Sequence, residues 1–222
     1  MLRFSLPLSF LLVVMAAPLV GKMTRFEIRD AAQRDVVQFN SDTALEKVAG
    51  LSSGIAGWME IDPELDSQGV RGEFEVDVRT FDTGNPLRND YLKEKFLNAA
   101  EFPLATYTLN KLLRSDKMRL LDQQPVVLRV EGSLKFKGVI KSQPVLLKLT
   151  YFKNSEQTKQ RLGGNLLRIA SNFDLDLNLF GIVIPESLRF RLSRFLQINV
   201  DVVGSDALAA QNLAIPEGIK PK

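Results

Sequence analysis

The segment VVLRVEGSLKFK at residues 126–137 decides the fold of this chain, because its apolar and polar residues alternate. Successive side chains of a β-strand point to opposite faces, so strict alternation predicts a strand with one buried and one solvated face. The apolar face carries Val126, Leu128, Val130, Gly132, Leu134 and Phe136. The polar face carries Arg129, Glu131, Ser133, Lys135 and Lys137. This pattern is typical of an antiparallel sheet with one apolar side.

Three further segments repeat the alternation: LRIASNFDLDLNL at 167–179, LQINVDV at 196–202 and EFEVDVR at 73–79. Clusters of turn-forming residues separate the strand segments, as in DTGNP at 82–86. A chain of 222 residues, 45% of them hydrophobic, can bury one sizeable core, and single all-β domains reach this size. The sequence therefore predicts an all-β fold in which about eight antiparallel strands close into a barrel.

The chain contains no Cys and no His. It therefore cannot form disulfides, thiolate nucleophiles, an imidazole base or a metal site with Cys or His ligands. The net charge of +3 is small, and the basic residues are interleaved with acidic ones, which argues against a nucleic-acid partner. We expect no cofactor and no catalytic residues.

The first residues match a secretory signal peptide, which we assign to residues 1–16. Met1–Arg3 supply a positive start, residues 4–14 an apolar run, and Val14, Met15 and Ala16 a small-residue cleavage pattern. No Cys follows, so a lipid anchor on an N-terminal Cys is excluded. We therefore expect a periplasmic or secreted protein with a barrel domain at residues 24–204 and a frayed C-terminal tail at 205–222.

Some segments depart from the strand pattern. Apolar residues recur at helical spacing from Leu87 to Asn98, which predicts a helix that either plugs one barrel end or acts as a lid over a cavity. Residues 41–50 carry a short helix-compatible pattern. Residues 153–164 are polar and predict a loop, whereas 182–194 predict another excursion without strands.

Longer motifs carry a family resemblance. They are GLSSGIAGWMEID at 50–62, FEVDVRTFDTG at 74–84, LRNDYLKEKFLNAAEFP at 87–103, EGSLKFKGV at 131–139 and FDLDLNLFGI at 173–182. In this order and spacing they resemble the YceI-like family. The resemblance implies a lipocalin-like, largely periplasmic antiparallel barrel whose interior holds a long isoprenoid chain.

The chain also departs from the family pattern. Family members commonly carry a His-Ser pair where this chain has Arg34 and Asp35, and a His where it has Tyr91. Any headgroup contact that depended on imidazole is therefore in doubt. Arg88 remains as a candidate functional cation, with pairing to Asp90 or to backbone carbonyls as the structural alternative.

We predict that an isoprenoid or other long-chain amphiphilic lipid binds the inward face of the strands, where burial of apolar area alone retains it. The candidate ligand-binding residues are Val76, Leu128, Val130, Leu147, Leu149, Ile169, Ser171, Phe173, Ile198 and Val200. A transient membrane contact and a homodimer stay open as further partners.

Three alternatives remain at this stage. The inward residues can interlock and leave no cavity, which would favour a structural or interaction role. The same alternation fits a small outer-membrane barrel whose apolar face points to lipid, although one Trp and three Tyr are few for two aromatic girdles. The third alternative is an enzyme that uses the carboxylate of Asp82 or Asp90 near a cavity mouth.

Overall fold

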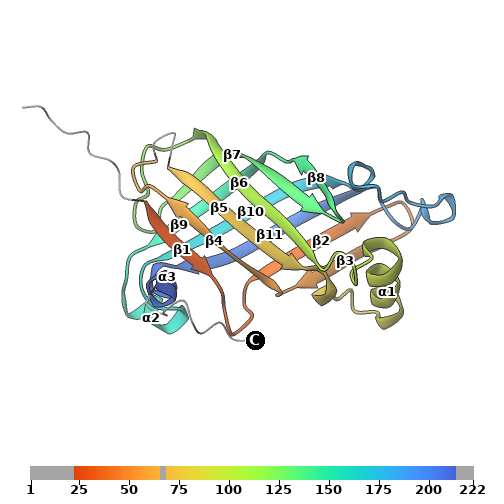
Figure 1. The fold of residues 1–222 in the computed structure, drawn as a ribbon, viewed down its shortest axis with the longest axis horizontal. Helices are drawn as coiled ribbons and strands as arrows, with labels where there is room; N and C mark the ends of the chain where they lie inside the picture. The colour runs from red at the N-terminus through yellow and green to blue at the C-terminus, as the bar shows by residue number, and fades with distance from the viewer. Residues whose placement is uncertain (1–22, 66–68, 214–222) are drawn as a thin grey trace, which may run out of the picture.

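The computed structural model describes residues 23–65 and 69–213, and antiparallel strands wrap into a closed barrel at its centre (Figure 1). The expected signal peptide at residues 1–16 lies outside the described residues. The strands are β1 (Thr24–Ile28), β2 (Val36–Asp42), β3 (Lys47–Ser52), β4 (Ile55–Ile61), β5 (Val70–Asp77), β6 (Leu104–Ser115), β7 (Pro125–Phe136), β8 (Val139–Ser142), β9 (Val145–Phe152), β10 (Leu166–Asp176) and β11 (Phe195–Ser205).

Helices occupy the connections and the end of the described chain. The α-helices are α1 (Pro86–Tyr91), α2 (Glu156–Arg161) and α3 (Asp206–Leu213). A π-helix, η2 (Leu92–Leu97), continues α1, and there are three short 3-10 helices, η1 (Val78–Thr80), η3 (Leu177–Phe180) and η4 (Glu186–Leu188). The helix expected from Leu87 to Asn98 is therefore confirmed as the pair α1 and η2.

Eight strands close the barrel in the order β1-β4-β5-β6-β7-β9-β10-β11, because β11 meets β1 at Ser205 and Glu27. The other three strands extend this wall: β2 pairs with β11, β3 with β2, and β8 with β7. All of these pairings are antiparallel, and the all-β barrel predicted from the alternating segments is confirmed.

The apolar face of each strand lies inside the barrel. Along β7, Val126, Leu128 and Val130 are fully buried, whereas Arg129 and Glu131 on the other face are exposed. The outer-membrane alternative required the opposite orientation, with the apolar residues outside. That alternative is wrong, because the apolar faces pack against one another and leave the charged faces to solvent.

Residues 41–50 are not helical. They form the end of β2, a turn and most of β3, with Val48 and Gly50 directed inward. The Thr43 backbone N–H closes the turn by donating to the Glu46 carbonyl at 3.1 Å. Backbone pairing between β2 and β3 therefore outweighs the local helical pattern, as tertiary context often does.

The loop prediction for 153–164 and the tail prediction for 205–222 each missed a helix. Helix α2 begins with a capping box, in which Ser155 accepts from the Thr158 backbone and Thr158 accepts from the Ser155 backbone. Helix α3 follows β11 directly and contacts β1, and its Ala209 is buried. The part of the tail at 214–222 lies outside the described residues.

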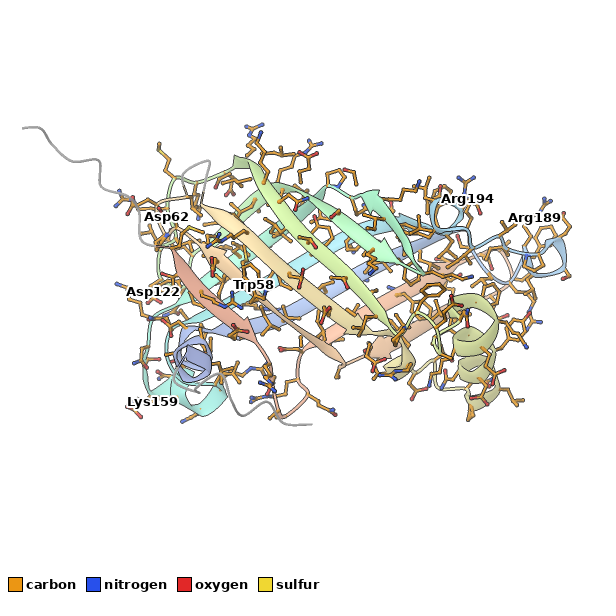
Figure 2. The ribbon with its side chains drawn as sticks, in the orientation of Figure 1. Trp58, Asp62, Asp122, Lys159, Arg189 and Arg194 are labelled. Atoms are coloured by element: carbon orange, nitrogen blue, oxygen red, sulfur yellow. The ribbon has the colours of Figure 1, made fainter. Side chains whose placement is uncertain are left out.

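The barrel has two dissimilar ends, which Figure 2 marks with labelled side chains. Asp62, Asp122 and Lys159 lie at the end that also carries α2 and α3, which we call the α2 end. Arg189 and Arg194 lie at the opposite end, which carries α1 and the connection between β10 and β11, and which we call the α1 end.

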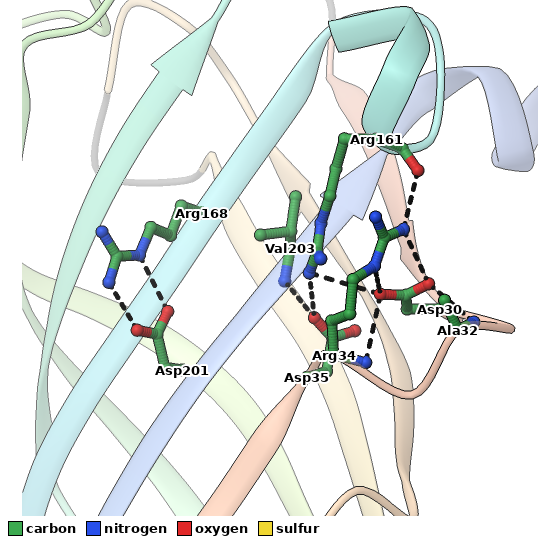
Figure 3. Close-up of polar contacts among 8 residues, drawn as sticks. All are labelled: Asp30, Ala32, Arg34, Asp35, Arg161, Arg168, Asp201 and Val203. Atoms are coloured by element: carbon green, nitrogen blue, oxygen red, sulfur yellow. Dashed lines mark hydrogen bonds and ion pairs between the residues drawn. The ribbon is translucent and has the colours of Figure 1, made fainter. Parts of the chain in front are cut away.

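A polar cluster lies on the outer wall where the strand paired with β11 changes from β2 to β1 (Figure 3). It bridges the short stretch of β11 that pairs with neither strand. The pairing of β2 stops at Asp201 and that of β1 begins at Ser205, so Val203 lies between them. The Val203 N–H donates to Oδ1 of Asp35 at 3.0 Å. A side-chain carboxylate thus replaces the strand carbonyl that this position lacks.

Charged neighbours hold this carboxylate in place. Arg161 donates to Asp35 Oδ1 at 3.2 Å and lies 3.3 Å from Asp30 Oδ2. Arg34 donates to both carboxylate oxygens of Asp30, at 2.7 and 3.0 Å. The residues Arg34 and Asp35, which depart from the family pattern, therefore serve barrel closure on the outer wall.

Candidate functional site

The interior of the barrel is filled at the α2 end. Eight apolar side chains there have no exposed area: Met59, Ile61, Val126, Leu128, Val130, Leu149, Leu167 and Val202. None of them borders an internal cavity. This half of the barrel is a close-packed core of the kind that the filled-interior alternative describes.

The interior is hollow toward the α1 end. An apolar cavity of about 180 Å³ lies there, lined by alternate residues of β5, β10 and β11 and by side chains from the connections at that end. Its wall is almost wholly hydrocarbon, because Tyr107 and Ser171 are the only lining residues of the described chain with polar side-chain groups. The barrel therefore combines a packed half with an open half.

Both polar lining groups are already satisfied by the protein. The Tyr107 hydroxyl donates to the Gln143 carbonyl at 2.9 Å, and burial raises the pKa of Tyr107, so the group stays neutral. The Ser171 hydroxyl donates to the Leu146 carbonyl at 2.8 Å. The Tyr107 ring also occupies the space beside Gly132, where any larger side chain would collide with it. Neither group has a free donor for a ligand.

Most of the residues predicted to bind a ligand lie around the cavity. Seven of the ten line it: Val76, Leu147, Ile169, Ser171, Phe173, Ile198 and Val200. The other three, Leu128, Val130 and Leu149, point inward as expected but lie in the filled half. Alternation assigns a side chain to the interior, yet it carries no information on the depth at which that interior is filled.

The cavity also has lining residues that strand alternation could not reveal. Leu92, Phe96 and Leu97 come from η2, and Ile182 and Leu192 come from the connection between β10 and β11. We call α1, η2 and residues 181–194 the cap, because they lie at the α1 end of the barrel (Figure 1), where η2 and the connection contribute side chains to the cavity wall. The helical spacing of Leu92 and Phe96 was the only sequence signal for this contribution.

The two parts of the cap are tied together through one carboxylate. Glu46, in the turn between β2 and β3, accepts from Arg88 of α1 at 3.2 Å and from Arg191 at 2.9 Å. Arg88 also donates to the side chain and the carbonyl of Thr83, both at 3.0 Å. Arg88 therefore has a structural role with Glu46 as its partner, rather than Asp90, and it does not line the cavity.

The two carboxylates considered as alternative catalytic groups, Asp82 and Asp90, lie away from the cavity. Both are exposed. The hydrogen bond from Asn89 lowers the pKa of Asp82, whereas a general acid at neutral pH needs a raised one. Within residues 23–65 and 69–213, no group of three or more acidic side chains could hold a metal ion.

No helix in the described part of the chain has the length and apolar character needed to cross a membrane.

A search among curated proteins finds no match. Solved structures do match. BcnA from Burkholderia cenocepacia has a TM-score of 0.61 at 18% identity, and the match covers 79% of this chain and 99% of BcnA.

A polyisoprenoid-binding domain from Saccharophagus degradans, described as implicated in plant cell wall breakdown, has a TM-score of 0.60 at 13% identity, with 83% and 99% of the two chains covered. A YceI protein from Campylobacter jejuni has a TM-score of 0.52 at 17% identity, with 69% and 82% covered. At these identities the likeness shows a shared fold. The model of the YceI-like domain matches residues 29–204, which is most of the chain, and the protein therefore belongs to the YceI-like family.

Proposed function

We propose that this protein binds a long-chain apolar lipid, of polyisoprenoid type, in the open half of its barrel. The observation that carries the proposal is the cavity at the α1 end, whose wall is almost wholly hydrocarbon and whose two hydroxyl groups have no free donor. Such a wall favours a ligand without polar groups, since each buried apolar Å² contributes roughly 25 cal/mol. Membership of the YceI-like family and the likeness to a polyisoprenoid-binding domain support the same ligand class.

The size of the cavity sets a condition on how such a ligand is held. A volume of about 180 Å³ is close to the roughly 150 Å³ that admits one benzene ring, and below the roughly 300–1,000 Å³ of typical ligand pockets. A long chain therefore fits only when cap side chains such as Leu92, Phe96 and Leu192 move outward. Binding in this proposal is coupled to displacement of the cap.

The proposed ligand contacts are the seven predicted residues that line the cavity, together with the cap residues. Leu128, Val130 and Leu149 are left out, because they are already packed against other side chains. The proposed activity is retention of the lipid without catalysis. We also propose that the protein is exported, on the basis of its N-terminal sequence and its family.

The direct test is native mass spectrometry of the purified protein, followed by organic extraction and identification of the bound molecule. Ile198 faces the cavity and Gln197, its neighbour on β11, faces outward. Ile198→Lys places a charge against the bound hydrocarbon and is expected to abolish the lipid mass, because a buried unpaired charge is costly. Gln197→Lys adds the same charge on the outside and is expected to retain it.

Circular dichroism of both variants establishes that the barrel is folded. Parent protein without any bound apolar molecule, and without uptake of an added polyprenol, would contradict the proposal. Equal lipid content in Ile198→Lys and Gln197→Lys would contradict the assigned location.

A further inference from the structure

The surface around the cavity carries an unusual combination of charge and exposed apolar groups at the α1 end. We call residues 135–142, the hairpin of β7 and β8, and residues 176–195, the connection between β10 and β11, the rim. Five large apolar side chains of the rim are between 52% and 74% exposed: Ile140, Leu179, Val183, Phe190 and Phe195. Bulky apolar side chains concentrated in this way on a surface mark a site of interaction.

The two halves of the rim lie side by side. Phe136 of the hairpin packs on Phe180 of η3 with ring centroids 5.5 Å apart, and β8 contacts η3. Figure 2 shows that Arg189 marks the far tip of the molecule at this end, with Arg194 nearer the barrel. The two segments of the rim therefore adjoin, and the connection between β10 and β11 protrudes beyond the barrel (Figure 1).

The charge of the rim is strongly asymmetric. Six cations, Lys135, Lys137, Lys141, Arg189, Arg191 and Arg194, stand against two carboxylates, Asp176 and Glu186. The three arginines pair with Glu186, Glu46 and Asp176, whereas the three lysines have no carboxylate partner within the described residues. Over the part of the chain that the structure describes, the unpaired positive charge of the rim is therefore carried by the three lysines of the hairpin, on the same segment as exposed Ile140.

The rim also flanks an interruption in the barrel wall. Along β10, pairing with β9 ends at Ser171, and the residues from Asn172 to Asp176 pair only with β11. Strand β8, which lies on the other side, pairs only with β7. No backbone ladder joins β8 to β10 in the described chain, and apolar side chains such as Leu134 and Leu175 fill this seam.

The inner side of the rim faces the cavity. Phe136, Ile182 and Leu192 line it, while Ile140, Val183 and Phe190 from the same segments are exposed on the outside. One layer of side chains therefore separates the cavity from the exposed apolar surface. A lipid that leaves the cavity through the seam emerges between the cations and apolar groups of the rim.

From this arrangement we propose that the rim is a docking surface for an anionic lipid bilayer, on which the protein exchanges its cargo directly with the membrane. The proposal rests on the proposed lipid binding. Basic side chains next to exposed Phe, Ile, Leu and Val fit such a surface, because cations are attracted to anionic headgroups and apolar tips enter the interface. A dimer formed through the rim would bring the positive charges of two copies together, and their repulsion disfavours a second copy as the partner.

The test is cosedimentation of the full-length protein with phosphatidylcholine vesicles that contain 30% phosphatidylglycerol or none. We expect binding to the anionic vesicles only, weakened by added salt. Lys137→Gln/Lys141→Gln is expected to weaken binding about 25-fold, at about fivefold for each charge removed. Val183→Ser/Phe190→Ser is expected to weaken it at least about tenfold, through loss of inserted apolar area.

Matched controls come from the α2 end. Met118 is 86% exposed there, and Lys153 follows β9 at the same end. Met118→Ser and Lys153→Gln are expected to bind like the parent. Equal binding to both vesicle types, parental binding by the rim variants, or equal loss in the controls would overturn the docking proposal.

Two further readouts separate this proposal from others. A parent protein that holds lipid by native mass spectrometry but ignores anionic vesicles overturns the docking surface and leaves lipid binding intact. A parent that binds anionic vesicles but holds no lipid overturns the proposed function and the exchange of cargo, and leaves the docking surface intact. A dimer in sedimentation velocity that Val183→Ser/Phe190→Ser converts to a monomer, without vesicle binding, identifies the rim as a contact between copies instead.

Discussion

Asp30 and Asp35, at the two ends of the loop between β1 and β2, respond in opposite directions to their surroundings. The Arg34 guanidinium lowers the pKa of Asp30 from 3.8 to about 2, helped by the Ala32 backbone N–H. Burial raises the pKa of Asp35, and its Oδ2 has no hydrogen-bond partner within the described chain. Asp30 therefore stabilises the folded state as an anion, whereas ionisation of Asp35 carries a cost that its contacts with Val203 and Arg161 offset only in part.

Asp30→Asn is expected to lower the free energy of unfolding by about 2 kcal/mol at pH 7. The side chain of Asp30 is 1% exposed, and the variant loses the carboxylate whose pKa folding lowers from 3.8 to about 2. The folded-state pKa is below the ordinary value, so this stabilisation is present above about pH 4 and disappears as the pH falls toward 2. Urea unfolding of parent and variant at pH 7, 4 and 2.5 measures the difference. Asp42→Asn, in an exposed pair with Lys47, is expected to change stability by less than about 0.5 kcal/mol. A constant difference across this pH range would refute the assignment.

At the scale of elements, the cap packs on the barrel through apolar side chains, with Leu97 against Val78 and Ile182 against Leu134. Asn85 caps α1 by accepting from the Arg88 N–H, and Pro86 occupies the first turn, so the helix has its own start signals. The connection at 181–194 is joined to the turn between β2 and β3 through Glu46 and through Thr43, whose hydroxyl lies 2.7 Å from the Phe190 carbonyl. These polar contacts add to the apolar packing of Leu97 and Ile182 and link the two parts of the cap to the turn between β2 and β3.

Glu46→Ala removes the carboxylate that joins Arg88 to Arg191. Ion pairs that are still partly open to solvent, as these are, contribute about 1 kcal/mol or less each, so the free energy of unfolding should change little. We expect instead that a fluorescent polyprenol analogue exchanges about fivefold faster, because cap opening becomes easier. Stopped-flow transfer from loaded protein to acceptor vesicles measures this rate. Glu186→Ala, which breaks only the exposed pair with Arg189 inside the connection, serves as control, and an equal acceleration in both variants would show that Glu46 has no special role.

At the scale of the whole molecule, the packed half of the barrel supplies stability, and the half with the cavity is the proposed binding site. Leu128 lies in the filled half, so Leu128→Ala is expected to lower the free energy of unfolding by about 2–5 kcal/mol through lost burial and a new cavity. The lipid content per folded molecule is expected to stay unchanged.

Val200 borders the open half, and Val200→Phe is expected to fill part of the cavity and lower the lipid content. The free energy of unfolding is expected to stay within about 1.5 kcal/mol of the parent value. Denaturant unfolding and native mass spectrometry on the same samples test both expectations, and a loss of lipid in Leu128→Ala with none in Val200→Phe would contradict the division.

Local sequence patterns predicted some elements of this fold and missed others. Strand β7 lies at Pro125–Phe136, where the alternation at 126–137 placed it, and the helix at 87–98 was found from its spacing. Local patterns failed where tertiary pairing outweighed them, as in β3, or where a short capped helix looked like a polar loop, as in α2. The partner of Arg88 could not be found from sequence, since Glu46 lies 42 residues away along the chain.

The sequence by itself determined the long alternating strands, their apolar faces and the absence of Cys and His chemistry, because alternation and composition are local properties of the chain. Only the tertiary structure decided which inward residues border free space. Val130 and Ile198 look alike in sequence, but one lies in the packed half and the other on the cavity wall. The reason is physical: whether an interior position is filled depends on the volumes of side chains contributed by many strands and by the cap at the same depth, and no single segment encodes that sum.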